Sequence, residues 1–423
     1  MVSKRLFLIL SISLLIILLT GCEKKATFSS PLYEIDCGDE VTFFVVSDPH
    51  FISKKTYDKN EAFENFCCTN DGKLLTYANE IIDTLVWEVK HKEPDFLIVS
   101  GDLSCNGEKE SHLDFAEKLA NIEEQGTGVF VIPGNHDIEN PWSSNYIGKE
   151  PCKTESITRE EFAEIYSSFG YDEAISRDKH SLSYLVTPGE DLWLIMLDST
   201  KKNNNKLSST PELGGMISSK TLKWIEECSK VAKENNAQLI VSMHHSLLTH
   251  NPVINDGYVI DNSQEVVEVF QKLGIEIVLT GHIHLQSIKS HVVDDYELYD
   301  IATGSLIAYP NLYGNLKYCP DIGFEYNTQR IDIENWAKNN DTKDKNLIEF
   351  NEYSQNYFEN RSYEKYYGTI VEKSSNSEID SFESMASAVA KLNLGYFNGL
   401  RNDKLISILD SAEYNTLIST LPD

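Results

Sequence analysis

Aspartate, histidine and asparagine residues follow five short apolar runs of the sequence, in a combination that could bind metal ions. They are Asp48 and His50 after 41–46, Asp102 after 95–99, Asn135, His136 and Asp137 after 129–132, His244 and His245 after 239–243, and His282 and His284 after 275–279. Mixed carboxylate, imidazole and amide donors suit zinc, manganese or iron, and poorly suit calcium or magnesium. These residues therefore predict a site for divalent transition metals.

Spacing within two of the groups favours shared ligation. In an extended chain, residues i and i+2 point the same way. Asp48 and His50 could therefore hold one ion together, and so could His282 and His284. A glycine, which allows a sharp turn and a close approach of the backbone, stands shortly before three of the groups. These glycines are Gly101, Gly134 and Gly281.

Alternating helices and strands are expected to position these residues. Apolar and β-branched runs predict strands at 41–46, 95–99, 129–132, 182–186, 192–197, 239–243, 275–279, 286–293 and 296–302. Helical spacing predicts helices at 74–92, 111–125, 219–235 and 263–273, and a capping box of Thr158 and Glu161 opens another. Such alternation predicts an α/β fold, whose sites form where the carboxyl ends of strands converge.

Strand patterns fade beyond about residue 325, and we expect the remaining hundred residues to be helical. Their predicted apolar face consists of Leu392, Leu394, Tyr396, Leu400, Leu405, Ile406 and Leu409. The sequence thus divides into a leader at 1–21, a polar tether at 22–40, an α/β domain at 41–325 and a helical C-terminal domain at 326–423.

The first residues have the pattern of a secretory signal. Lys4 and Arg5 precede an apolar run of 14 residues at 6–19, which is shorter than the roughly 20 residues that span a bilayer. Leu19-Thr20-Gly21-Cys22 resembles the bacterial lipobox, in which cleavage precedes the cysteine and its sulfur is lipidated. We therefore expect an exported protein that Cys22 anchors at the extracytoplasmic face of the cell membrane.

Charge and cysteine content exclude two other classes. The formal net charge of −29 and the pI near 4.7 argue against a nucleic-acid duplex as partner, since no basic stripe is present. Seven cysteines remain besides Cys22, and none forms a CxxC pair, so a zinc ribbon is excluded.

In order along the chain, the blocks Asp48-x-His50, Gly101-Asp102, Gly134-Asn135-His136-Asp137, His244 and Gly281-His282-x-His284 resemble the signature of the calcineurin-like metallophosphoesterases. This resemblance covers residues 41–305 and implies a β-sandwich flanked by helices. It implies that one metal is held by Asp48, His50 and His284, that Asp102 bridges both metals, and that the second is completed by Asn135, His244 and His282. It places His136 beside the substrate phosphate, steadied by Asp137, as electrostatic stabiliser or general acid.

The resemblance also implies the chemistry. Two divalent ions (manganese, iron or zinc) would support hydrolysis of a small phosphate ester by attack of a metal-bound hydroxide. Phosphodiesters such as 3',5'-cyclic nucleotides are the expected substrates, because the chain is most similar to bacterial lipoprotein members that resemble cyclic-nucleotide phosphodiesterases.

Two other functions stay open. A metal- or solute-binding surface lipoprotein could use similar residues, although such a protein needs neither an asparagine ligand nor so many donors. A scaffold that has lost its ligands is the second alternative.

For four further residues the sequence leaves the role open. His245 could support the metal ligands without binding metal itself. His112 and His250 could line the substrate pocket or lie at the surface, and Asp198 could support the site or belong to a turn.

Overall fold

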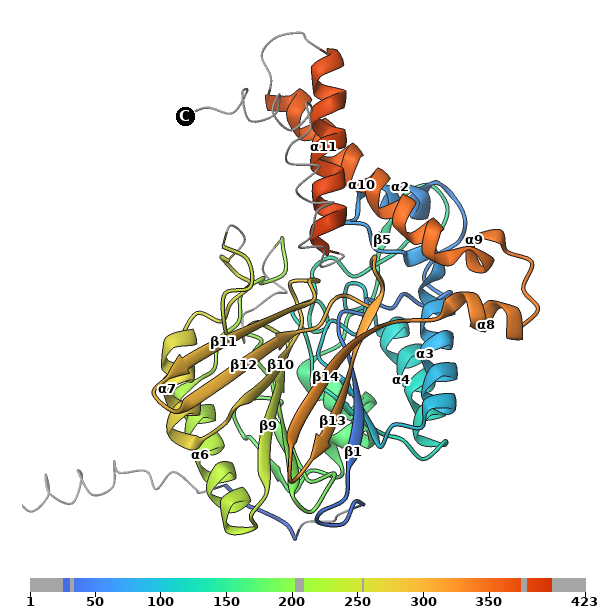
Figure 1. The fold of residues 1–423 in the computed structure, drawn as a ribbon. Helices are drawn as coiled ribbons and strands as arrows, with labels where there is room; N and C mark the ends of the chain where they lie inside the picture. Colours follow the sequence, from blue (N-terminus) through green and yellow to red (C-terminus); the bar gives the residue numbers. More distant parts are fainter. Residues whose placement is uncertain (1–25, 31–33, 202–208, 253–254, 374–378, 398–423) are drawn as a thin grey trace, which may run out of the picture.

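The computed structural model describes residues 26–30, 34–201, 209–252, 255–373 and 379–397 (Figure 1). The predicted leader and Cys22 lie outside the described residues. None of the helices in these ranges combines the length and the hydropathy that a membrane-spanning helix requires.

A five-stranded sheet carries the first candidate ligands. Its strand order is β14 (Gly323–Arg330), β13 (Leu312–Cys319), β1 (Val41–Val46), β2 (Phe96–Val99) and β3 (Gly128–Val131). The strands β1, β2 and β3 are parallel, with Val45 paired to Ile98 and Ile98 to Phe130, whereas β13 and β14 run antiparallel to their neighbours. The carboxyl ends of β1, β2 and β3 therefore meet at one edge.

A seven-stranded sheet carries the remaining ligands. Its order is β11 (Ser287–Val293), β12 (Tyr296–Ala302), β10 (Ile277–Thr280), β9 (Gln238–Met243), β8 (Leu192–Leu197), β7 (Tyr184–Val186) and β6 (Ser176–Arg177). The four central strands, β12, β10, β9 and β8, are parallel, and β11, β7 and β6 are antiparallel.

The two sheets pack face to face between helices. Along β8, Leu194 and Met196 join the core shared with the five-stranded sheet, whereas Trp193 and Ile195 face a second core. That second core is covered by α6 (Ser219–Glu234) and α7 (Ser263–Leu273), and the outer face of the five-stranded sheet by α3 (Ala78–Lys92) and α4 (Lys109–Glu123) (Figure 1). This confirms the predicted α/β sandwich flanked by helices.

Most predicted elements occur within a few residues of their expected bounds. The predicted capping box is present at α5 (Arg159–Ile165), where the Thr158 side chain accepts from the Glu161 N–H. The helix expected from residue 74 begins with a 3-10 turn, η1 (Leu75–Tyr77). The sequence analysis missed α2 (Glu61–Thr69) and the β13–β14 hairpin. The expected boundary at 325 falls inside β14, so the helical region begins only after Arg330.

In the described residues after β14, up to residue 397, the chain forms α8 (Ile333–Asn339), α9 (Lys345–Ile348), α10 (Phe350–Lys373) and α11 (Ile379–Phe397). The helix α10 lies against the segment 67–73, where Tyr357 Oη donates to the Cys67 carbonyl at 3.1 Å and Arg361 donates to the Cys68 carbonyl at 2.9 Å. Of the predicted apolar face, Leu392 and Leu394 of α11 are partly buried, whereas Tyr396 is 39% exposed. Leu400, Leu405, Ile406 and Leu409 lie outside the described residues.

Glu88 of α3 connects this helical region to the sandwich. Its carboxylate is buried, and one oxygen, Oε2, accepts from Tyr313 Oη of β13 and from Lys92 Nζ, each at 2.5 Å. The other oxygen accepts from the backbone N–H of Asp332, just before α8, at 2.5 Å.

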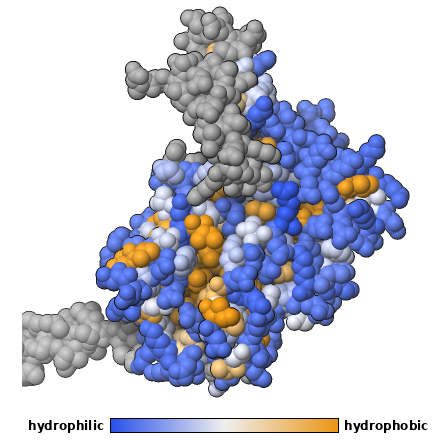
Figure 2. All heavy atoms as spheres, in the orientation of Figure 1, coloured by the Kyte–Doolittle hydropathy of each residue, from blue (hydrophilic) through white to orange (hydrophobic). Residues whose placement is uncertain are grey.

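The face of the molecule seen in Figure 2 is mostly hydrophilic, and apolar side chains appear over β11 and between the two sheets. On β11, Ile288 and Val292 are 48% and 61% exposed, because this edge strand turns one face to solvent.

Tyr184 of β7 joins the seven-stranded sheet to the free edge of β3. Its buried hydroxyl accepts from Val131 N at 3.0 Å and donates to Val131 O at 2.7 Å. Because β3 ends the five-stranded sheet, these backbone groups have no neighbouring strand on that side.

We expect Tyr184→Phe to lower the free energy of unfolding by about 1–3 kcal/mol, since it leaves buried backbone groups of Val131 without a partner. Urea denaturation measures the change. Tyr299→Phe, on the exposed face of β12, is the control and should stay within about 0.5 kcal/mol of wild type. Equal stability of both variants would show that this hydroxyl does not hold the edge of β3.

Candidate metal centre

Two groups of buried donor atoms lie at the carboxyl ends of the parallel strands. The first consists of Asp48, His50, Asp102 and His284, and the second of Asp102, His244 and His282. Within each group the candidate ligand atoms all lie within 4.8 Å of one another. Asp102 belongs to both, which is the geometry that a bridging carboxylate requires.

In the first group, imidazole nitrogens face carboxylates and one another. His284 Nε2 lies 3.1 Å from His50 Nε2 and 3.2 Å from Asp48 Oδ1. Asp102 Oδ2 lies 3.6 Å from His50 Nε2. Donor atoms from the segments that follow β1, β2 and β10 therefore lie close together.

In the second group, His244 Nε2 lies 3.4 Å from Asp102 Oδ2 and 3.2 Å from Asn135 Oδ1. Its Nδ1 donates to the Ser100 carbonyl at 2.9 Å, which turns Nε2 inward. The ring of His282 lies 4.9 Å from that of His244, and its Nε2 donates to the Gly257 carbonyl at 3.0 Å. Outer hydrogen bonds of this kind orient metal-ligating histidines.

These residues fit metal ions. Asp48 Oδ1 and His50 Nδ1 are buried without a hydrogen-bond partner, and such atoms are costly unless something else satisfies them. For Asp48 Oδ1, which faces His284 and His50, a cation in the first group would do so. The donor set of carboxylates, imidazoles and one amide suits a divalent transition metal.

Three of the candidate ligands, Asp102, His50 and His282, have pKa values that suit metal ligation. Burial alone would raise the pKa of Asp102, but His244 and His136 outweigh it and hold that pKa well below its usual range. Burial lowers the pKa of His50 well below its usual range and that of His282 to about 3. Metal ligands must be deprotonated, and these three residues are so at neutral pH. For His244, burial is outweighed by the charges of Asp102 and Asp48, which raise its pKa to about 9, so an ion in the second group would have to displace a proton from that ring.

His282 and His284 join different groups, so the prediction from their i, i+2 spacing was wrong. That argument assumed an extended chain, whereas the backbone is left-handed at both residues, with φ of 67° and 57°. It is also left-handed at Asp48 and His50, which do share a group, so the i, i+2 spacing alone does not decide which residues bind the same ion. The partition that the family resemblance implied places them as the structure does.

His136 lies beside the first group, with its ring 4.9 Å from that of His50. Its Nδ1 lies 2.9 Å from the Cys105 carbonyl and 3.1 Å from Asn106 Oδ1. Two oxygen acceptors at Nδ1 fix the ring hydrogen there, which leaves Nε2 as the nitrogen available to a ligand. Burial lowers the pKa of His136 to about 4, despite the opposing charge of Asp102.

Asp137 holds the loops rather than the His136 ring. One of its oxygens accepts from the N–H groups of Leu103 and Gly134, and the other from the N–H and hydroxyl of Ser104. The loops after β2 and β3 are thereby tied together. The family resemblance implied that Asp137 steadies the His136 side chain. In the structure, the His136 ring instead contacts the Cys105 carbonyl and Asn106.

The remaining candidate histidines have structural partners. His245 uses Nδ1 on Ser199 Oγ at 2.8 Å and Nε2 on the Leu213 carbonyl at 3.1 Å. His112 is fully buried against Ser104 and Tyr166, so it neither lines the pocket nor lies at the surface.

His250 is also buried, with Nε2 3.2 Å from Asp300. Asp198, whose role the sequence left open, is buried and paired with Arg159.

The three predicted glycines are required for space. A Cβ at Gly281 would collide with Ser47 Oγ and lie 2.8 Å from Asp48 Oδ2. Those at Gly101 and Gly134 would collide with the His244 ring and with Asp102. Only Gly101 among them also has a positive φ, of 99°.

Several residues around the centre carry no motif and were missed. The ring of Tyr258 lies 4.9 Å from that of His282, and the ring of Trp142 lies 6.3 Å from that of His136. Lys365 of α10 pairs with Asp71 at 2.5 Å. Burial and the charge of Asp71 raise the pKa of Tyr258, and the charge of Lys365 opposes this rise, so the C-terminal region acts electrostatically on Tyr258.

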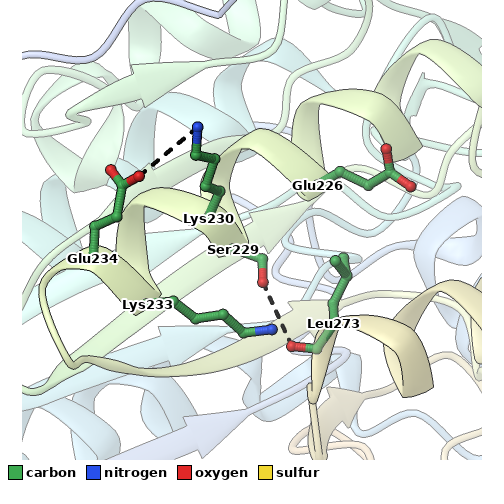
Figure 3. A pocket seen from close by; sticks show the side chains of 6 residues that line it. All are labelled: Glu226, Ser229, Lys230, Lys233, Glu234 and Leu273. Atoms are coloured by element: carbon green, nitrogen blue, oxygen red, sulfur yellow. Dashed lines mark hydrogen bonds and ion pairs between the residues drawn. The ribbon is translucent and has the colours of Figure 1, made fainter.

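A surface pocket lies elsewhere, on α6 and α7 (Figure 3). Its lining is mainly charged, and Lys230 pairs with Glu234 at 3.8 Å across a helical turn. It shares no residue with the metal groups, which argues against a role in the same chemistry.

Buried aspartates and histidines at the strand ends of an α/β sandwich define a metallophosphoesterase centre. Residues 41–286 match the calcineurin-like phosphoesterase family, and residues 332–422 match the C-terminal domain of cyclic nucleotide phosphodiesterase. The first match covers more than half of the chain. The chain belongs to the calcineurin-like phosphoesterase family, a family of phosphoric ester hydrolases.

Similar proteins include two bacterial enzymes. The 3',5'-cyclic adenosine monophosphate phosphodiesterase CpdA of Haemophilus influenzae is 24% identical over 240 residues, which cover 56% of this chain and 68% of that protein. A probable cyclic nucleotide phosphodiesterase of Xenorhabdus bovienii is 22% identical over 47% of this chain and 64% of its own length. A dimetal phosphatase of Danio rerio aligns with a TM-score of 0.47 at 13% identity, over 69% of this chain and 99% of its own.

We expect the purified protein to bind two transition-metal ions per chain and Asp102→Asn to bind one or none. The variant replaces the carboxylate common to both donor groups by a neutral amide. Elemental analysis after purification with excess metal measures the content, and Asp294→Asn, in the exposed β11–β12 turn, should retain two ions. One ion or none in the wild type would contradict a binuclear centre.

Proposed function

We propose that this chain hydrolyses phosphodiesters such as 3',5'-cyclic nucleotides at two divalent transition-metal ions. The observation that carries the proposal is the position of Asp102 between two donor groups. The named activities of the Haemophilus and Xenorhabdus proteins and the match of residues 332–422 support the choice of a cyclic diester.

One ion would be held by Asp48, His50, His284 and Asp102, and the other by Asp102, Asn135, His244 and His282. When bound, such ions polarise phosphoryl oxygens and lower the pKa of water. Manganese, iron and zinc all suit these donors.

The protein's own groups orient the reaction. Asp137 fixes the loops that carry Asp102 and His136. The Cys105 carbonyl and Asn106 turn His136 so that Nε2 is the nitrogen that would contact the phosphate. Because the neutral ring carries its hydrogen on Nδ1, His136 would have to take up a proton at Nε2 before it could stabilise charge there or protonate the leaving oxygen.

We expect His136→Ala to lower kcat by about 10²–10⁴-fold, the usual contribution of a positioned proton donor or acceptor. Its metal content should stay at two, because His136 belongs to neither donor group. Assay of a cyclic nucleotide with parallel elemental analysis tests both statements. His180→Ala, at the surface, is the control. Loss of metal in His136→Ala would instead make His136 a ligand, and full activity would remove its role.

We also propose that the protein is exported and anchored to the outer face of the cell membrane through lipidated Cys22. The support is the basic start, the apolar run at 6–19 and Leu19-Thr20-Gly21-Cys22.

We expect Cys22→Ser to release the protein into the medium or to leave it as an unprocessed precursor. A lipid anchor stabilises membrane binding by about 0.8 kcal/mol per buried CH₂, and the variant has none. Fractionation with immunoblotting measures the distribution, and Cys37→Ser is the control. A Cys22→Ser protein that is still processed and remains with membranes would contradict lipidation.

A further inference from the structure

Trp142 is an exposed aromatic side chain next to the metal centre. All five tryptophans lie in the described part of the chain, and Trp142, with 43% of its side chain exposed, is more exposed than the other four, which are buried or partly buried. Its ring centroid lies 6.3 Å from that of His136, with 65° between the ring planes. Exposed aromatic surface beside a buried polar centre has no structural explanation in the packing of the described residues.

The indole is held by its edge. Nε1 donates to the Ser209 carbonyl at 3.0 Å, and the backbone N–H donates to Asn140 Oδ1 at 2.8 Å. Asn140 in turn donates to the His136 carbonyl at 2.9 Å. The ring is therefore fixed relative to His136, while its faces make none of these hydrogen bonds.

The other aromatic side chain near the centre differs. Tyr258 lies 4.9 Å from the His282 ring with only 37° between the planes, so one of its faces is covered by a candidate metal ligand. Tyr258 is also only partly exposed. Trp142 is consequently the better platform for a group that arrives from solvent.

We propose that Trp142 binds the flat organic group of the substrate by stacking, so that the site takes phosphodiesters that carry a nucleobase. The proposal rests on the proposed function, in which the phosphate lies at His136. A group esterified to that phosphate lies within reach of the neighbouring indole. Every nucleobase has a π-face, so this contact tolerates different bases. Stacking also needs no positive charge, which suits a chain of net charge −29.

The kinetic test compares two esters with the same phosphodiester ring. One is 3',5'-cyclic adenosine monophosphate, and the other is the 3',5'-cyclic phosphate of methyl riboside, which lacks a base. Trp142→Ala should raise KM for the nucleotide by about 5- to 150-fold, the loss expected for one stacked base, and leave KM for the base-free ester unchanged. Trp142→Phe should show a smaller rise. Equal effects on both esters, or none, would overturn the proposal.

A binding test does not depend on turnover. Stacked 5'-adenosine monophosphate should quench the tryptophan fluorescence of the metal-loaded full chain. The quenching should disappear in Trp142→Phe and persist in Trp87→Phe, which changes a partly exposed tryptophan of α3. Persistence in Trp142→Phe would overturn the proposal. If the metal-loaded wild type hydrolyses neither ester, the proposed function fails, and the quenching still decides whether Trp142 binds the base.

Discussion

At the ends of β1, β2 and β10 the backbone turns left-handed on residues that carry a Cβ. Asp48, His50, Asp102, His282 and His284 have φ between 37° and 67°. Such turns cost about 1–3 kcal/mol each and persist only where the surroundings determine them. Here the surroundings are two sheets packed face to face, together with backbone bonds such as His50 N to the Asp102 carbonyl at 2.9 Å. The buried sandwich is what makes five such residues tolerable in one place.

The strands and the turns that follow them differ in how far they could be predicted from the sequence. Buried strands of the sandwich are apolar and short, and each ends in a polar block, so both the fold and the set of candidate ligands were recognisable. The division of His282 and His284 between two groups was not, because it depends on dihedral angles that spacing does not encode. The β13–β14 hairpin was missed because glycine, asparagine and charged residues interrupt the apolar pattern of both strands, and β14 is an edge strand with a largely polar sequence.

The net charge of the chain and the charges at the metal centre have opposite effects on an anionic substrate. The whole chain repels anions, so an approaching phosphate ester gains little from the long-range field. Binding must then depend on short-range contacts: the cations held by the two donor groups, His136 and an aromatic surface. Trp142 could not be recognised from the sequence, because it belongs to no motif. Only the fold shows that its ring lies beside that of His136.

The buried carboxylate of Glu88 has a consequence for how the protein denatures. Glu88 of α3 accepts hydrogen bonds from Lys92, from Tyr313 of β13 and from Asp332 at the start of the helical region. If one of these donors were lost, the buried carboxylate would remain with too few hydrogen bonds, which is costly. The sandwich and α8 should therefore melt in a single calorimetric transition. A replacement of the helical region by another segment would therefore have to supply a new donor to the second oxygen of Glu88.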